Sequence, residues 1–190
     1  DPQPKSGDIM GYIIDAIRPS GKRAGMELDA PARFELPMDR YSADTIECWR
    51  HGGVWSSWAN WVPQELQDPG ILAMVADSVR GERPAALPAQ PTTAMYVSKW
   101  DLYGYHEGKR WQEYLEAYGT LTGNGREIID VITDDVVLAR PELLERYTRI
   151  EVPYGDCLDR RIADLLGRQG DKVRRHRPES FGRHLLDVSQ

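Results

Sequence analysis

The sequence lacks the cysteine content of a disulfide-stabilised protein. It has 190 residues and two cysteines, Cys48 and Cys157, which lie 109 positions apart. Two distant cysteines do not form the framework of a small secreted domain. A chain of this length can also bury a sufficient core without disulfides. We therefore expect reduced thiols and a cytoplasmic location.

Long apolar runs are also missing. No stretch approaches the roughly 18 apolar residues of a membrane helix, and the chain does not open on a basic and then apolar signal peptide. We therefore expect no membrane partner. The first residue is Asp1 rather than Met, so we expect the numbering to start at a processed or trimmed end.

Complete catalytic and cofactor motifs are absent as well. The sequence contains no Walker loop, dinucleotide fingerprint, nucleophile elbow or paired zinc motif. Residues 20–25 combine two glycines with two cations, as a phosphate-binding loop does, but they lack the full pattern and a preceding strand. A solvated loop is the better interpretation, and no cofactor can be assigned.

The charge is unevenly distributed. The net charge of the chain is −6, but residues 158–190 carry eight Lys or Arg against five Asp or Glu, which leaves −9 on residues 1–157. This acidic body argues against nucleic-acid binding over the whole surface. The basic segment 171–177 is expected to contact an anionic partner. The side chains concerned are Lys172, Arg174, Arg175 and Arg177. An acidic protein face or self-association is favoured, with nucleic acid as the alternative.

Tryptophan is concentrated in one stretch, because four of the six tryptophans lie within residues 49–61. Such a cluster is either a core nucleus or a binding wall. Helical spacing of Val54, Trp58, Trp61 and Val62 favours the core. Trp55 lies beside the small residues of this stretch and is the one expected to face a pocket. The predicted ligand-binding aromatics are Trp49, Trp55, Trp100 and Tyr105.

Two histidines are candidates for chemistry. Cys48 and His51 would share a helix face, as a zinc site requires, but further ligands are remote, and no metal is predicted. His106 lies in an aromatic loop beside Glu107, so it is a candidate general acid or base. A loop packed on the end of a sheet is the more common arrangement. The candidate catalytic residues are His51, Asp101, Tyr103, His106 and Glu107.

An acidic group follows in residues 127–135. Glu127, Asp130, Asp134 and Asp135 offer oxygens of the kind that magnesium prefers. A solvated helix face is the more common explanation for such a group, and we expect one here.

Periodicity predicts the fold class. Apolar spacing favours helices over residues 9–17, 42–51, 54–62, 71–79, 111–118, 128–136, 141–147 and 158–166, with a short last helix from Pro178. Strands are expected at residues 32–36, 92–98 and 150–152, and a loop at 18–32. This predicts a mainly α-helical single α+β domain with two or three short strands. Alternating strands and helices are too sparse in the predicted pattern for a doubly wound sheet. Residues 1–190 divide into possible lobes, 8–81 and 92–190, joined by the proline-rich segment 82–91.

Two classes of function remain. The favoured one is a non-catalytic binding or adaptor protein that uses its aromatic surface for a protein or small-molecule partner. The alternative is a small enzyme with His106 or His51 as general acid or base. A nucleic-acid-associated protein acting through residues 171–177 is a further alternative.

Overall fold

The structure is a computed structural model that describes residues 6–29, 38–53, 56–59, 77, 80–81, 88–104, 109–124 and 126–188. Several predictions lie outside these residues. They concern the strand 32–36, most of the helix 71–79, and most of the connection 82–91.

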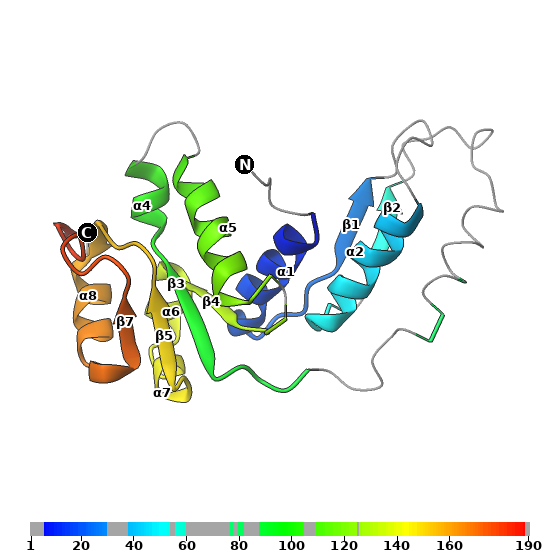
Figure 1. The fold of residues 1–190 in the computed structure, drawn as a ribbon. Helices are drawn as coiled ribbons and strands as arrows, with labels where there is room; N and C mark the ends of the chain where they lie inside the picture. The colour runs from blue at the N-terminus through cyan, green and yellow to red at the C-terminus, as the bar shows by residue number, and fades with distance from the viewer. Residues whose placement is uncertain are drawn as a thin grey trace.

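A four-stranded parallel sheet organises the chain (Figure 1). Its strands are β3 (Thr93–Val97), β4 (Asp130–Thr133), β5 (Arg149–Val152) and β7 (Val173–Arg175), in the order β4-β3-β5-β7. From β3 the chain first adds β4 on one side of β3, and then crosses to the other side of β3 to add β5 and β7. The carboxyl ends of β3 and β5 lie where this direction reverses. Open α/β sheets form ligand crevices at such a switch point.

Helices cover both faces of this sheet. The described helices are α1 (Ser6–Ile17), α2 (Met38–Arg50), α4 (Lys99–Gly104), α5 (Lys109–Leu121), α6 (Asp134–Ala139), α7 (Leu143–Arg146) and α8 (Arg160–Gly167), with short 3₁₀ turns η1 (Arg18–Ser20) and η3 (Gly170–Lys172). Of these, α2 packs on α1 rather than on the sheet. Two further parallel strand pairs are β1 (Met26–Asp29) with β2 (Ser56–Ala59), and β6 (Cys157–Asp159) with β8 (His184–Leu186). Within the described segments, no helix has the length and apolar character needed to span a bilayer.

Successive side chains of β3 face opposite sides of the sheet, so the hydrophobic core has two parts. Ala94 and Tyr96 pack with side chains of α6, α7 and α8 on one face. Met95 and Val97 pack with α1 and α5 on the other face. All four are at most 1% exposed, and burial of a large apolar side chain stabilises a fold by roughly 1.5–3 kcal/mol. The central strand is therefore fixed from both sides.

Helix α1 lies between the sheet and the unit formed by β1, β2 and α2 (Figure 1). Tyr12 on α1 makes edge contacts with the rings of Trp111 and Tyr118 on α5, with centroids 5.0 and 5.3 Å apart. Helix α1 also packs closely against α2. Thus α1, from the predicted lobe 8–81, contributes to the core of the sheet.

The predicted fold class is wrong, because the protein is an α/β protein with a parallel sheet rather than a mainly helical α+β domain. The reason is clearest at residues 128–136, where isoleucines and valines fit helical spacing. Val131 and Ile132 face opposite sides of the sheet and are both fully buried, which is the pattern of a strand covered on both faces. In the same way, β1 lies in the predicted loop 18–32 and β2 in the predicted helix 54–62.

Other elements are confirmed. Helices α1, α2, α5, α7 and α8 and strands β3 and β5 lie where their periodicity predicts. The N-cap of α8 is Asp159, whose Oδ1 accepts a hydrogen bond from the Arg161 backbone N–H at 2.8 Å. The last helix from Pro178 is not formed, because turns occupy residues 178–182 before β8.

Candidate functional site

Asp101 stands at the switch point, in α4 directly after β3. Its side chain is fully buried. Oδ1 accepts a hydrogen bond from the backbone N–H of Cys157 at 2.7 Å, and Oδ2 accepts one from the Tyr114 hydroxyl at 3.1 Å. Burial raises the pKa of Asp101, although these hydrogen bonds oppose the rise. This predicted catalytic residue therefore joins the segment after β3 to the segment after β5.

Ser98 makes a second connection across the same edge. Its hydroxyl donates to the carbonyl oxygen of Cys157 at 2.7 Å, and its backbone N–H donates to the Tyr114 hydroxyl at 3.3 Å. Ser98 is fully buried, as is Tyr114. The polar groups nearest the switch point are thus bonded to one another.

The thiol of Cys157 is the potential nucleophile at this edge. It is a free cysteine of intermediate exposure. Burial raises its pKa, and the neighbouring charges of Asp101 and Asp156 raise it further. Because the thiolate is the nucleophilic form, this environment is unsuited to nucleophilic catalysis near neutral pH.

Tyr154, just after β5, lies between two cations. The guanidinium carbons of Arg110 and Arg177 are 4.5 and 4.8 Å from its ring centroid. Arg110 is also paired with Asp156 at 3.0 Å and with Glu113 at 2.9 Å. These contacts use the positive charge of Arg110 within the protein.

The end of β4 carries a buried carboxylate. Asp134 accepts hydrogen bonds from the Tyr96 hydroxyl at 3.1 Å and from the Lys99 backbone N–H at 2.7 Å, and burial raises its pKa. Asp130, at the start of β4, is also fully buried. The predicted solvated helix face is therefore wrong for both carboxylates, because they lie in and directly after the buried strand β4.

An aromatic pair projects from α4 at the same edge. The rings of Trp100 and Tyr103 meet at 75° with centroids 6.4 Å apart, and Tyr103 is 74% exposed. The Lys99 ammonium lies 5.5 Å from the centroid of the Trp100 ring. Both predicted site aromatics are thus brought together, at the carboxyl end of the central strand.

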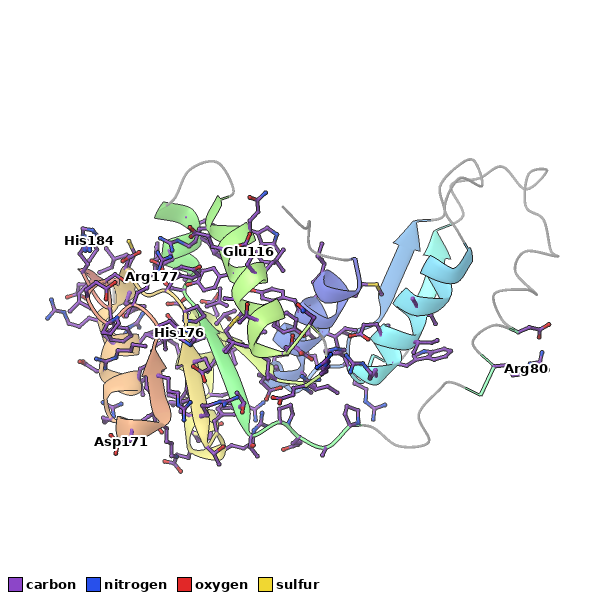
Figure 2. All side chains as sticks on the ribbon, in the orientation of Figure 1. Arg80, Glu116, Asp171, His176, Arg177 and His184 are labelled. Carbon is purple, nitrogen blue, oxygen red and sulfur yellow. The ribbon has the colours of Figure 1, made fainter. Side chains whose placement is uncertain are left out.

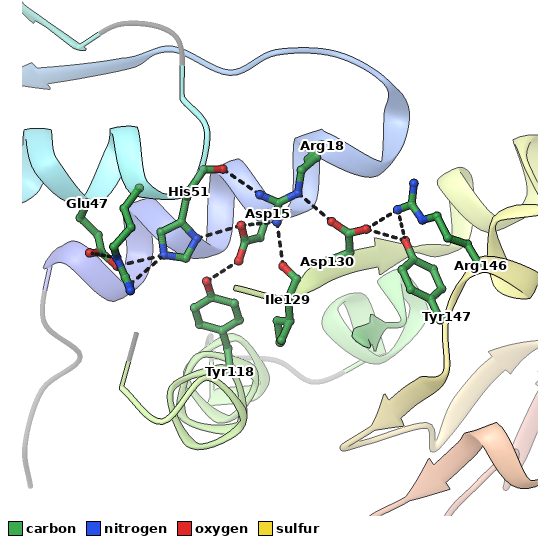
Figure 3. Close-up of polar contacts among 10 residues, drawn as sticks. Asp15, Arg18, Glu47, His51, Tyr118, Ile129, Asp130, Arg146 and Tyr147 are labelled. Atoms are coloured by element: carbon green, nitrogen blue, oxygen red, sulfur yellow. Dashed lines mark hydrogen bonds and ion pairs between the residues drawn. The ribbon is translucent and has the colours of Figure 1, made fainter. Parts of the chain in front are cut away.

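His51 lies far from this edge, in a buried polar network (Figure 3). Its ring is 1% exposed. Nδ1 lies 2.9 Å from Asp15 Oδ1, and Nε2 lies 2.9 Å from Glu47 Oε1. The Tyr118 hydroxyl donates to the other oxygen of Asp15 at 2.7 Å. Both ring nitrogens are therefore occupied, which leaves no ring nitrogen for a substrate.

The network continues to the start of β4. Arg18 donates from Nε to Asp130 at 2.8 Å and from Nη2 to Asp15 at 2.5 Å. Asp130 also pairs with Arg146 and accepts a hydrogen bond from the Tyr147 hydroxyl at 2.8 Å. Two buried carboxylates thus hold two arginines in place, at the amino ends of the strands (Figure 3).

A pocket opens beside these arginines. Its volume is about 290 Å³, and its wall includes η1, the turn after α2, the segment before β3, and the ends of α6 and α7. The cationic side chains that line it are Arg18, Lys22, Arg23, Arg140 and Arg146. It therefore lies at the edge of the sheet opposite to the switch point.

The predicted basic segment is spread along β7 rather than gathered into one cluster. Lys172 precedes the strand and donates to the Glu145 carbonyl oxygen at 3.3 Å. Arg174 is exposed within β7, while Arg175 covers the ring of Phe181 at 4.0 Å. Arg177 lies beyond the other end of β7. Figure 2 shows it at the opposite end of the strand from Asp171.

Other predicted site residues are placed apart or lie outside the description. Trp49 is on α2 with intermediate exposure, remote in the fold from Trp100 on α4. Trp55, Tyr105, His106 and Glu107 lie outside the described residues. Among those described, no group of three or more His, Cys, Asp or Glu side chains is arranged to hold a metal ion.

Comparisons with known proteins relate the chain to a glycosidase by fold alone. No family model matches, and no curated protein matches by sequence. The solved structures that match include Gan42B, a GH42 β-galactosidase from G. stearothermophilus, and a catalytic mutant of the same enzyme. Their TM-scores are 0.62 and 0.61, at 14% and 13% identity. The match covers 86% of this chain, which spans 28% of that enzyme.

Sequence reasoning missed the pocket and most of its wall. Lys22 and Arg23 were noticed as part of a glycine-rich loop. Arg140 and Arg146 gave no local signal, because each belongs to an ordinary helix end. Only the topology brings them beside Arg18, which lies more than a hundred positions earlier in the chain.

Proposed function

We propose that this chain is a non-catalytic binding protein that contacts its partner through Trp100 and Tyr103. The observation that supports this is the exposure of Tyr103, which presents 74% of its surface directly after the central strand. Aromatic side chains supply a large contact area at a low cost in conformational entropy. The pair also lies at the edge where open α/β sheets hold their ligands.

The state of the neighbouring polar groups supports binding rather than catalysis. Asp101 and Asp134 are buried, and each has both oxygens engaged. The raised pKa of Cys157 disfavours a nucleophilic thiolate. Such an arrangement fixes the shape of the edge but leaves little for acid–base or nucleophilic chemistry. Both cysteines are free thiols, in keeping with the cytoplasmic location that belongs to this proposal.

Galactosides are the first small molecules to test. The structural relatives are β-galactosidases, and aromatic rings are suited to packing against flat apolar faces of a ligand. The shared fold carries no activity with it, since the chain spans 28% of that enzyme. A protein partner at the same aromatic pair is the other form of this proposal.

The proposal is tested by tryptophan fluorescence, because Trp100 adjoins Tyr103. Lactose is titrated into the parent chain, Tyr103→Ala and the matched control Tyr103→Phe, which keeps the ring. We expect Tyr103→Ala to weaken binding by roughly 2- to 12-fold, the value of one aromatic contact, and Tyr103→Phe to bind like the parent. Hydrolysis of a chromogenic β-galactoside is measured in parallel and should be absent.

Turnover of the chromogenic substrate would overturn the non-catalytic proposal. If lactose does not bind, the protein form is tested by comparing partners retained by the parent and by Tyr103→Ala from the source extract. Equal retention of every partner by both chains would reject Tyr103 as the contact residue. The exposed Arg174 on the outer strand β7 remains a second proposed contact for an acidic protein face.

A further inference from the structure

The pocket at the amino ends of the strands is not used by the proposed function. We propose that it binds a small organic anion, one that carries a phosphate or carboxylate group on a compact body. The pocket has a volume of about 290 Å³, and five cationic side chains line it. No acidic side chain among the described residues belongs to its wall. This inference stands independently of the Trp100–Tyr103 surface, which lies at the opposite edge.

The inner cations of the pocket are Arg18 and Arg146, and carboxylates of the protein already neutralise their charge. Arg18 pairs with Asp15 and Asp130, and Arg146 pairs with Asp130. Arg18 also donates to the carbonyl oxygens of His51 and Ile129, at 2.7 and 2.9 Å. These two arginines therefore form a rigid wall, and their charge is balanced by two buried carboxylates.

The excess positive charge of the pocket comes from its outer cations, which are Lys22, Arg23 and Arg140. Lys22 and Arg23 are exposed, and neither has a hydrogen-bond or ion-pair partner among the described residues. Arg140 donates from Nη1 to the Pro19 carbonyl oxygen at 3.0 Å, while its Nε contact with Glu142 is longer, at 3.5 Å. A ligand anion would pair with Lys22 and Arg23 without breaking a buried contact. Guanidinium groups suit both carboxylate and phosphate oxygens.

Local geometry directs these cations toward the pocket. Gly21 ends η1 with a φ of 78°, and its N–H donates to the Arg18 carbonyl oxygen at 2.9 Å. An added Cβ at Gly21 would lie 3.4 Å from Arg140 Nη1, so the turn passes close to that guanidinium. The turn thus places the following cations near Arg140 before any ligand arrives. Such preorganisation lowers the entropic cost of binding.

Apolar groups complete the wall and indicate an organic rather than a bare inorganic anion. They are Ile14, Pro19, Ala24, Pro88 and Pro91. Ligand pockets commonly combine an apolar wall with a few polar groups that fix orientation. A phosphate or carboxylate would meet the cations, and the body of the ligand would meet this apolar wall.

The test is isothermal titration calorimetry on the full chain with phenyl phosphate, benzoate and neutral benzyl alcohol. Three proteins are compared: the parent, K22S/R23S, and the matched control R160S/R168S. The control removes two exposed cations, Arg160 at the start of α8 and Arg168 at its C-cap, and α8 lies on the other face of the sheet from α1. Arg140→Ser is a further variant, because it removes a cation that lies nearer the wall.

We expect the parent to bind at least one of the two anions at a single site, and to bind benzyl alcohol more weakly. K22S/R23S should weaken anion binding by at least about tenfold, as expected for lost charge-assisted contacts, and the control should stay within about twofold. A preference between phenyl phosphate and benzoate would identify the anionic group. The proposal is overturned if neither anion binds the parent, if K22S/R23S and Arg140→Ser both bind like the parent, or if the control loses affinity equally.

Discussion

His51 links protonation to the stability of the fold. Burial by itself lowers the pKa of His51, but hydrogen bonds and charge interactions with Asp15 and Glu47 outweigh burial and leave the pKa above its usual value. The folded protein therefore holds this proton more tightly than the unfolded chain does. The resulting stabilisation is fully present below about pH 6.5, the unfolded pKa, and is lost as the pH rises through the folded pKa.

We predict that His51→Gln loses most stability at acidic pH. The difference in free energy of unfolding between parent and His51→Gln, measured by urea denaturation, should shrink as the pH rises from about 6 to 9. His184→Gln, which changes an exposed histidine on β8, serves as the control. A difference that does not change with pH would mean that the folded protein does not favour the imidazolium.

At the residue scale, the sequence indicates which side chains are candidates for a site, but it does not predict their hydrogen-bond and ion-pair partners. Asp101, a candidate from the sequence, lies at the switch point, but its hydrogen bonds to Cys157 and Tyr114 depend on the strand order. The importance of Asp130 was not predictable, because one partner, Arg18, lies 112 positions away. Local charge patterns assign such carboxylates to solvent, and only tertiary structure shows that they are buried and paired.

At the scale of elements, the contact between α1 and α2 depends on a glycine. A Cβ at Gly11 would lie 2.9 Å from two atoms of the His51 ring and 3.1 Å from the Tyr118 hydroxyl. Alanine normally favours a helix interior over glycine by about 1 kcal/mol. Here the added methyl group would push into a buried ring that is held at both nitrogens.

We therefore predict that Gly11→Ala destabilises the protein by about 1–3 kcal/mol, the usual cost of overpacking, despite the gain in helix propensity. The matched control is Gly167→Ala at the end of α8, where no atom lies within 4 Å of the added Cβ. Thermal unfolding of the two variants gives the comparison. Equal or higher stability of Gly11→Ala would show that α1 and α2 can separate without cost.

Element prediction succeeded for helix α5, which buries one face, and failed for strand β4, which is buried on both faces. Helix α5 has polar residues opposite its apolar stripe, so Trp111, Tyr114 and Tyr118 identify it as a helix. In β4, Val131 and Ile132 are apolar in succession because helices cover both sides of the sheet. Such a run fits helical and strand spacing equally well.

At the scale of the whole molecule, residues 82–91 are the expected site of proteolysis. Prolines there limit backbone pairing, so limited proteolysis should cut this segment before it cuts α5. Because α1 packs on α5 and β4, we predict that the two fragments stay together on size-exclusion chromatography after cleavage. Separate elution of the fragments under native conditions would show that the segments 8–81 and 92–190 are independent lobes.

The order of the strands in the sheet could not be predicted from the sequence, because it depends on contacts between distant segments and not on local residue patterns. Strand β3 is central although it is the first strand of its sheet in the chain, with β4 on one side and β5 on the other. Strands β6 to β8 are short and carry few apolar residues. The pattern of alternation that identifies an α/β protein was therefore incomplete in the sequence.

Parallel pairing also governs the order in which the chain assembles. Every strand pair of the described residues is parallel, and even the paired residues nearest in sequence, Ile150 and Val173, are 23 positions apart. None of these pairs is a hairpin that could seed the sheet, so distant segments must meet before these ladders form, which slows folding. During synthesis, β3 leaves the ribosome before β4, β5 and β7 do, and its apolar residues wait without a partner strand. In that interval the nascent chain depends on its early helices, or on a chaperone, to avoid aggregation.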